Sequence, residues 1–329
     1  MQVFKGERLD SVYRDMLVEL LEEGVEVSPR GMKTLEFASP VSIVVDKPNQ
    51  SVVTNPSRKA LVSFYMGEFL WMLRGSNNLD IVANYLKGWR MFSDDGKTLN
   101  GAYGDRIFNW GKDKINQFDK VYEKLKNDKN CRQAVISIYN PDKDLLPTKD
   151  TPCNNFIQFY VRNDKLCCTV YQRSCDIISG LTYDMHMFAT FQALMAGRLG
   201  LEVGNYTHIA NSLHIYEKDF EMAKNIINDK TPTYYTDDMD IDYRIPAKDY
   251  EDEIYKLLRV EKISREFTDI VGMKELKYLI ETIQNKHWRS AMAMIVMFNL
   301  RKGGRKEEAY EFYGYLQNEF EKIILERWQ

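Results

Sequence analysis

The sequence predicts an α+β fold, a mixed sheet packed with helices, followed by an all-helical C-terminal extension. Between residues 131 and 183, short β-branched and aromatic segments alternate with turn formers, which is typical of a sheet. Apolar residues at helical spacing precede and follow them. From about residue 251 onward the pattern is helical throughout. The expected organisation is therefore a core of residues 1–250 and a helical extension of residues 251–329.

Composition places the chain among globular proteins. Of its 329 residues, 44% are hydrophobic and 28% are charged, so the chain buries a substantial core and is not disordered. The 45 Lys and Arg residues nearly balance the 48 Asp and Glu residues, leaving a formal charge of −3. This balance does not favour a protein that coats nucleic acid or an anionic membrane, so any phosphate must be bound locally.

The start of the sequence and its cysteines bear on location. Charges interrupt the first turns, and no window approaches 18 uncharged apolar residues, so we expect neither a signal peptide nor a membrane span. The five cysteines form an odd set without CxxC spacing. We therefore expect free thiols and a cytoplasmic location, which for a phage-encoded protein is the host cytoplasm.

The N-terminal region predicts a helix, a strand and a second helix. Residues 8–24 place apolar side chains at helical spacing, and Gly24 stands where a helix would stop. Residues 34–46 are β-branched and apolar, which predicts a strand followed by a loop. Residues 60–74 are apolar nearly all round, which predicts a buried helix that contains Glu68.

The rest of the core predicts further helices around the sheet. Residues 111–130 are typical of a solvated amphipathic helix rather than a nucleic-acid patch. Residues 186–201 return to helical spacing after the sheet segments. Residues 204–216 predict another strand, and a helix is expected to begin near Glu217.

A cysteine at the start of a predicted strand is a candidate nucleophile. Cys153 follows Pro152, and Arg173 comes twenty residues later. A thiolate is the competent nucleophile, and a nearby guanidinium is expected to lower the thiol pKa and hold it ionised. The alternative is that Cys153 only fills space as a small buried hydrophobe.

Three segments carry a resemblance to a known family: TPCNNFIQFYV, YQRSCDIISGL and LHIY, supported by GEFLWMLRG and NGAYGDR. In this order they closely resemble the thymidylate synthase family, over roughly residues 8–250. The resemblance implies a thymidylate-synthase-like mixed sheet packed with helices. It also implies that Cys153 adds to C6 of a pyrimidine nucleotide, which makes C5 nucleophilic toward the co-substrate 5,10-methylenetetrahydrofolate.

The resemblance also implies a phosphate site and a homodimer. Arg30, Arg173 and Ser174 match residues that hold the 5′-phosphate, and guanidinium groups suit a dianion. Arg132 matches an arginine that the partner subunit contributes. The family usually carries a second arginine next to it, where this chain has Gln133.

Other matched positions surround the sugar, the base and the folate. His214 and Tyr216 match the pair that binds the sugar 3′-hydroxyl, and Tyr103 matches the tyrosine associated with removal of the C5 proton. Glu68 matches a carboxylate that organises water and moves protons. The alternative is that Glu68 is a buried helix charge paired to an arginine. Three positions match the folate side or the space beside the base: Asp176 for the pterin, Trp89 for the indole and Gly180 for close approach.

Two positions depart from the family pattern. Asn154 stands where a histidine follows the cysteine, and Asp184 stands where an asparagine reads uracil. A carboxylate cannot donate to O4 of uracil, but it can accept from the exocyclic amine of cytosine and from a protonated N3. The resemblance therefore implies a cytidylate substrate. The alternative is that Asp184 only caps a helix starting at Met185.

Spacing gives no support to other cofactors. The four histidines lack HExxH or Cys/His spacing, so no catalytic metal is expected, and no glycine-rich loop of the dinucleotide or ATP type occurs.

The leading hypothesis is a 5-hydroxymethyltransferase acting on dCMP, in which water completes the reaction. C5-methylation of dCMP, with Trp89 as a shield against water, remains an alternative, as do hydroxymethylation of CMP and thymidylate synthesis from dUMP. A catalytically idle RNA-binding or scaffold relative is a further alternative. A scaffold has no need of Cys153, Arg173, Asp176 and His214 together. No membrane or nucleic-acid partner is expected.

Overall fold

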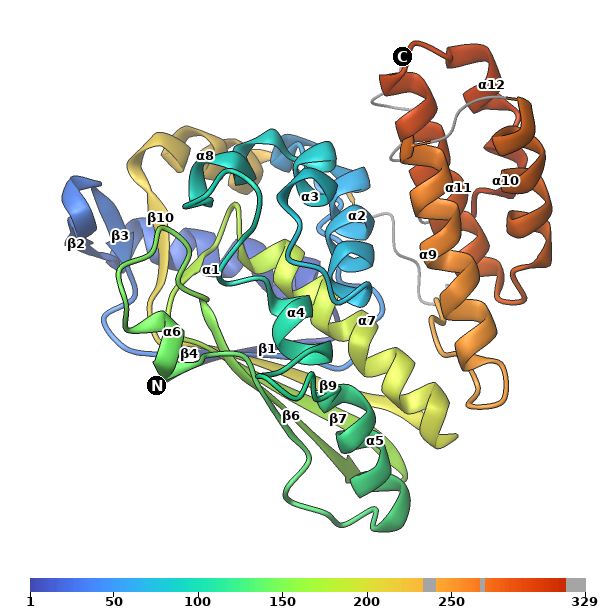
Figure 1. Ribbon diagram of the computed structural model, residues 1–329. Helices are drawn as coiled ribbons and strands as arrows, with labels where there is room; N and C mark the ends of the chain where they lie inside the picture. The colour runs from blue at the N-terminus through green and yellow to red at the C-terminus, as the bar shows by residue number, and fades with distance from the viewer. Residues whose placement is uncertain (233–240, 267–269, 318–329) are drawn as a thin grey trace.

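The predicted α+β fold is confirmed. The structure is a computed structural model that describes residues 1–232, 241–266 and 270–317. Two sheets lie on one side of the molecule, and a cluster of C-terminal helices lies on the other, with buried helices between them (Figure 1). The last described residues lie beside this cluster of C-terminal helices.

The main sheet is mixed and six-stranded, in the order β1-β4-β9-β7-β6-β5. Pairs β1/β4 and β7/β9 are parallel, and the other neighbours are antiparallel. Its strands are β1 Gln2–Gly6, β4 Val41–Val45, β5 Val135–Ser137, β6 Asn154–Arg162, β7 Lys165–Gln172 and β9 Glu202–Ala210.

A smaller sheet stands at the end of the main one, in the order β2-β3-β10-β8. Its strands are β2 Val25–Val27, β3 Thr34–Glu36, β8 Cys175–Asp176 and β10 Leu213–Tyr216. The predicted single strands 34–46 and 204–216 are therefore wrong, because each splits between the two sheets. The breaks lie at residues 37–40, which contain Pro40, and at Asn211 and Ser212.

Two buried helices pack above the main sheet. Helix α7, Leu181–Leu199, lies on strands β7 and β9, and α2, Val62–Leu73, packs on α7. Every residue of α2 is buried, as its sequence predicted. Helix α7 begins at Leu181 rather than at Met185 or later, since its first turn follows Gly180 and uses residues expected in a strand.

The remaining helices of the core cover the edges. Helix α1 ends before Gly24 and α5 buries one face, both as predicted. The core contains α1 Leu9–Glu23, α3 Leu79–Tyr85, α4 Tyr103–Phe108, α5 Gln117–Asn127, α6 Pro141–Asp144 and α8 Phe220–Asn228. Short 3-10 turns lie at Pro29–Gly31, Pro56–Arg58, Lys87–Phe92, Glu217–Asp219 and Tyr313–Tyr315.

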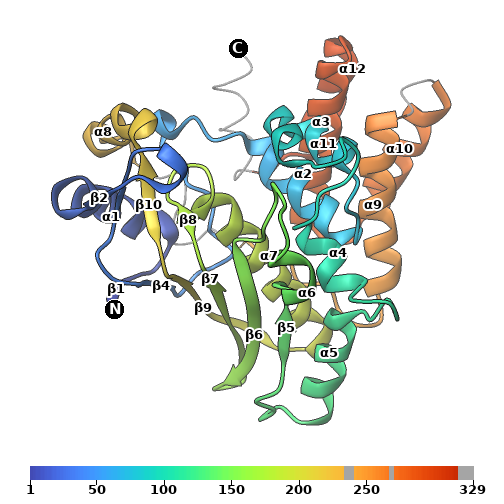
Figure 2. The ribbon, with the colours of Figure 1, turned by 60° about the vertical axis from the view of Figure 1, so that its left-hand side comes forward.

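The extension is helical where it is described. It contains α9 Tyr250–Glu266, α10 Ile270–Thr282, α11 Lys286–Lys302 and α12 Lys306–Tyr310, and residues 318–329 lie outside the described part. Helices α9 and α11 pack on α2 (Figure 2). The Trp288 ring lies 5.7 Å from the Phe69 ring, so buried side chains run continuously from core to extension. The boundary at residue 250 stays a prediction.

Candidate active site

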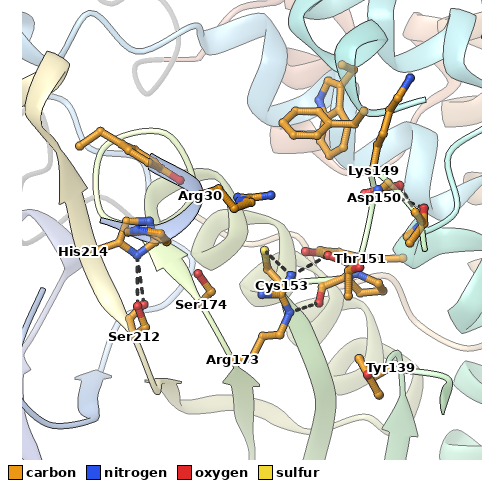
Figure 3. A pocket seen from close by; sticks show the side chains of 18 of the residues that line it. Arg30, Tyr139, Lys149, Asp150, Thr151, Cys153, Arg173, Ser174, Ser212 and His214 are labelled. Atoms are coloured by element: carbon orange, nitrogen blue, oxygen red, sulfur yellow. Dashed lines mark hydrogen bonds between the residues drawn. The ribbon is translucent and has the colours of Figure 1, made fainter. Parts of the chain in front are cut away.

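One cavity of about 600 Å³ opens where the two sheets meet. Segments that lie far apart in the sequence line it, including residues 148–153, which lead into β6, Ser212, and His214 and Tyr216 on β10. Figure 3 shows Arg30, Cys153 and Arg173 converging on one space, with Ser212 and His214 on one side and Lys149 and Asp150 on the other.

Most of the predicted site residues line this cavity. They are Arg30, Trp89, Tyr103, Cys153, Arg173, Ser174, His214 and Tyr216. Glu68, Asn154 and Asp184 do not form its wall, but each interacts with a wall residue or with a neighbour of one. Asp176 and Gly180 lie at β8 and at the start of α7, outside the wall.

The cysteine loop is held by the arginine that the sequence pairs with it. Arg173 donates to the carbonyl oxygens of Pro152 at 2.9 Å and Thr151 at 2.8 Å. Its Nη2 lies 3.8 Å from Cys153 Sγ. Arg173 therefore fixes the backbone of the nucleophile as well as its electrostatic surroundings.

The expectation of a lowered thiol pKa is wrong for the protein without substrate. Burial raises the pKa of the Cys153 thiol above its ordinary value, and Asp184 and Asp150 raise it further. Arg173 and Arg30 lower it, but they do not outweigh the cost of burying a thiolate. The thiol is therefore largely protonated at neutral pH, and proton removal must accompany its attack.

The cationic end of the cavity contains an arginine with an unusual backbone. Arg30 lies in a 3-10 turn with φ 53°, and Gly31 follows with φ 79°. A left-handed conformation costs a non-glycine residue about 1–2 kcal/mol. The side chain is exposed and reaches Tyr216 across the cavity. This geometry suits a group that binds an anion.

Arg132 lies elsewhere on the chain. It is exposed just before β5 and does not line the cavity of its own subunit. The neighbouring Gln133 accepts from Lys124 at 3.1 Å. The placement agrees with a contribution to another subunit's site, which stays a prediction.

The opposite wall presents hydrogen-bonding side chains from the small sheet. His214 on β10 lies opposite Glu36 on β3, and its ring lies 5.1 Å from the Tyr216 ring. Ser212 donates to Glu36 at 2.7 Å, and the Ser212 carbonyl lies 3.4 Å from His214 Nδ1. Glu36 and Ser212 line the cavity but were not predicted, because neither stands in one of the motifs that the sequence revealed.

A polar cluster lies beneath Cys153. The buried Asn154 donates its backbone N–H to the Tyr103 hydroxyl at 3.4 Å. Its side-chain amide lies near enough to Tyr103 and Asp184 to lower the pKa of both, but neither amide atom has a partner within full hydrogen-bond geometry. Burial raises the pKa of Tyr103 well above its ordinary value, and the nearby Asp184 raises it further. An unpaired buried amide is costly, so it favours a ligand or water at this point.

Two carboxyl groups complete this cluster. Burial, opposed by a hydrogen bond from Gln172, raises the pKa of Asp184 to about 7. Burial and then Asp184 raise the pKa of Glu68 well above its ordinary value. No lysine or arginine in the described residues forms an ion pair with Glu68, so the structure gives the arginine-partner reading no support. Asp184 lies within α7 behind Gly180, so the helix-capping reading is wrong.

The far end of the cavity is aromatic. The rings of Trp71 and Trp89 lie 5.9 Å apart, and those of Trp89 and Phe92 lie 5.7 Å apart. Both indole N–H groups are buried without a partner. Flat apolar walls with free donors suit a planar heterocycle such as the pterin of folate. Trp71 and Phe92 were not predicted, although Trp71 stands three residues after Glu68 in the same motif.

Across the described ranges, no group of three or more His, Cys, Asp or Glu side chains gathers as metal ligands would. No helix in those ranges is both long and apolar enough to span a bilayer.

Comparison with known proteins decides the family. The thymidylate synthase family model matches residues 11–266. The chain belongs to the thymidylate synthase family. This membership confirms the resemblance and extends it from residue 250 to the end of α9.

Two relatives from bacteriophages are similar to this family member. The chain is 37% identical over 232 residues to "Deoxyuridylate hydroxymethyltransferase" of Bacillus phage SP01, covering 67% of this chain and 60% of the relative. It is 33% identical over 223 residues to a protein of the same name from Pseudomonas phage M6, covering 66% and 62%. The match thus spans about three fifths of each relative.

Proposed function

We propose that this protein transfers a one-carbon unit from 5,10-methylenetetrahydrofolate to C5 of dCMP, and that water completes the reaction to give 5-hydroxymethyl-dCMP. Family membership and the names of both relatives support one-carbon transfer and the hydroxymethyl product. The observation that carries the choice of base is Asp184, a carboxyl group beside Cys153 whose pKa is raised to about 7.

Counting protons explains why this carboxyl suits cytosine. Neutral cytosine presents an acceptor at N3 and a donor at the exocyclic amine. A protonated carboxyl donates to N3 through one oxygen and accepts from the amine through the other. Because the pKa of Asp184 is raised to about 7, the required proton is available near neutral pH. When C6 is saturated, N3 becomes more basic and the proton moves from Asp184 to N3.

The chemistry uses the remaining cluster. The Cys153 thiol gives its proton to water in the cluster while its sulfur adds to C6 and the π electrons move to C5. C5 bonds to the methylene carbon as one of that carbon's two bonds to folate nitrogen breaks, and that nitrogen takes up a proton. The proton then leaves C5, with Tyr103 and a water held by Glu68 beside it, as the second carbon–nitrogen bond breaks and the second nitrogen takes up a proton. Water adds its oxygen to the exocyclic carbon and gives up one proton. Loss of sulfur from C6 then releases the product and tetrahydrofolate.

In this proposal the cavity walls hold the rest of the two substrates. Arg30, Arg173 and Ser174 bind the 5′-phosphate, where two guanidinium groups match its charge. His214 and Tyr216 bind the sugar 3′-hydroxyl. The aromatic end with Trp89 takes the folate, and Asp176 with Gly180 lies behind the base and pterin.

The proposed assembly is a homodimer with Arg132 completing the partner's phosphate site. Helices α5 and α7 cover one face of the main sheet, while no described helix covers the opposite face of β6 and β7 (Figures 1 and 2). On that face the half-buried rings of Phe156 and Tyr171 stack at 5.6 Å. An uncovered apolar sheet face supports a second copy as its cover.

We also propose the reducing cytoplasm as its location. All five cysteines are free, and burial raises the pKa of Cys167, Cys168 and Cys175, which protects these thiols from oxidation.

A second candidate is hydroxymethylation of dUMP. The names of both relatives favour it. A protonated Asp184 donating to O4 and accepting from N3–H would satisfy uracil as well.

The test is to incubate the protein with methylenetetrahydrofolate and dCMP, dUMP or CMP, and to measure the product mass and the absorbance of dihydrofolate. We expect turnover mainly of dCMP, a hydroxymethyl product and no dihydrofolate. A methyl product with dihydrofolate would contradict the role of water, and preference for dUMP would establish the second candidate.

A further inference from the structure

A chain of buried polar groups runs from the main sheet to Asp184. The Tyr206 hydroxyl lies 2.9 Å from His208 Nδ1, and His208 Nε2 lies 2.7 Å from Gln172 Oε1. Gln172 Nε2 donates to Asp184 Oδ2. Tyr206 and His208 come from β9, Gln172 from β7 and Asp184 from α7, three elements that pack side by side (Figure 1). Tyr206, His208 and Gln172 have no exposed surface.

The donor and acceptor roles along this series of hydrogen bonds follow from the chemistry of the side chains. The Gln172 amide turns its NH₂ group to Asp184, so its oxygen faces His208 and needs a donor there. His208 must then carry its proton on Nε2. Burial lowers the pKa of His208 to about 3, so the ring is neutral and has a single N–H. Its bare Nδ1 therefore accepts from the Tyr206 hydroxyl.

We propose that His208, locked in one tautomer by Tyr206, is a positioning residue that holds the Gln172 amide as a donor to Asp184 Oδ2. Because Oδ2 is kept as an acceptor, the proton of neutral Asp184 is confined to Oδ1. The carboxyl then presents one fixed donor and one fixed acceptor to the base. This consequence for base selection rests on the proposed function.

The surroundings of Asp184 make this donor important. The titratable groups that face it are Glu68 on α2, Tyr103 on α4, Cys153 before β6, Cys175 on β8 and Tyr206 on β9. None of these groups is cationic. Within the described residues, Gln172 and then Asn154, rather than an ion pair, therefore oppose the effect of burial on Asp184.

Two substitutions interrupt this series of hydrogen bonds at different points. In His208→Phe, Gln172 Oε1 loses its donor. In Tyr206→Phe, the histidine keeps its place but can move its proton to Nδ1, which allows the Gln172 amide to turn over. The matched control is His186→Phe, since His186 is also buried, its pKa is lowered by burial to about 4, and it lies on α7 with Ser51 as its neighbour.

The first measurement is the infrared titration of the Asp184 carboxyl in the free, full-length protein, isolated by subtracting the spectrum of Asp184→Asn. A hydrogen bond to a charged group is worth about 1.5–3 kcal/mol, so we expect the midpoint to rise by roughly one pH unit or more in both variants. It should not move in His186→Phe. An unshifted midpoint in Tyr206→Phe and His208→Phe would overturn the proposal that His208 positions the Gln172 amide.

The second measurement is binding of dCMP and dUMP by calorimetry at one pH. We expect the dCMP-to-dUMP affinity ratio to fall at least tenfold in Tyr206→Phe, by about 1.4 kcal/mol, because the proton can then occupy either oxygen. The titration needs no nucleotide. If the carboxyl midpoint shifts in the variants but the unmutated protein prefers dUMP, the hydrogen-bonded chain is kept and the proposed function is rejected. If the midpoint shifts but the dCMP-to-dUMP affinity ratio does not change, the role of the chain in base selection is overturned.

Discussion

Single residues decide both the nucleophile and the base in this protein. Burial raises the pKa values of both Cys153 and Asp184, and Asp184 lies close enough to raise the pKa of the Cys153 thiol further. One perturbed group in a cavity wall with another behind it is what a site for proton transfer and covalent catalysis requires. The sequence predicted both residues but not that burial would raise their pKa values.

Replacement of the nucleophile should separate binding from chemistry. In Cys153→Ala we expect turnover to fall below detection while the Kd for nucleotide stays within about threefold, since other residues hold phosphate and sugar. Calorimetry and product mass measure the two effects. Cys167→Ala, a buried cysteine outside the cavity wall, is the control and should keep its turnover. Near-normal turnover in Cys153→Ala would reject covalent catalysis.

The raised pKa of Asp184 should cost stability in a defined pH window. The native carboxyl binds its proton up to about pH 7, whereas the unfolded one loses it near 3.8, so the free energy of unfolding falls between these values as pH rises. Asp184→Asn removes this loss. We expect its gain in unfolding free energy to be about 3 kcal/mol larger at pH 8 than at pH 5. Urea unfolding at both pH values measures it, and a pH-independent difference would contradict the raised pKa.

The site was predictable where residues stand together in motifs. Cys153, Arg173 and Ser174 belong to two short segments, and the structure brings both to the cavity. Gln172 and His208 meet only because β7 and β9 pair, and no local spacing reveals that contact. The thiol pKa was mispredicted because a sequence shows the nearby charge but not the competing burial.

At the scale of elements, the prediction failed where the chain crosses from one sheet to the other. Residues 34–46 and 204–216 are apolar runs, and such a run looks the same whether it forms one strand or two. The start of α7 was misplaced because Thr182 and Tyr183 favour strands, and packing on the sheet overrides this preference. The periodic segments of α1 and α2 were predicted correctly, whereas the helix predicted over residues 111–130 is confirmed only over Gln117–Asn127.

The extension is tied to the core through a buried carboxylate. Glu261 on α9 accepts from Arg74 at 2.8 Å, Arg265 at 2.7 Å and Tyr85 at 3.0 Å. Its side chain is only 1% exposed. Arg74 follows α2 and Tyr85 ends α3, so one residue links the extension to the helix that contains Glu68.

Loss of this link should destabilise the protein. In Glu261→Ala two arginines lose their partner in a mostly buried place, so we expect a loss of about 2–4 kcal/mol in unfolding free energy. The control is Glu275→Ala. Glu275 pairs with Arg259, and both side chains are about a third exposed, so we expect a loss of only about 0–1 kcal/mol in unfolding free energy. Equal effects in urea unfolding would show that Glu261 is not a link.

At the scale of the whole molecule, the proposed site belongs to two subunits. Mixing inactive Cys153→Ala with inactive Arg132→Ala subunits forms hybrids in which one of the two sites is intact. Random exchange should thus restore about a quarter of normal activity. Subunit exchange, shown by mass spectrometry of the intact dimer, is the control. Exchange without recovered activity would reject a shared site.

Whether Asp184 reads the base is tested by the ratio of kcat/KM for dCMP to that for dUMP, in the unmutated protein and in Asp184→Asn. A site that pairs with one donor and acceptor pattern rejects the opposite pattern by roughly 10⁴. We predict that the unmutated protein prefers dCMP and that Asp184→Asn shifts the ratio toward dUMP by about two decades or more, at about 1.4 kcal/mol each. Preference for dUMP in the unmutated protein, or an unchanged ratio in the variant, would contradict Asp184 as the residue that reads the base.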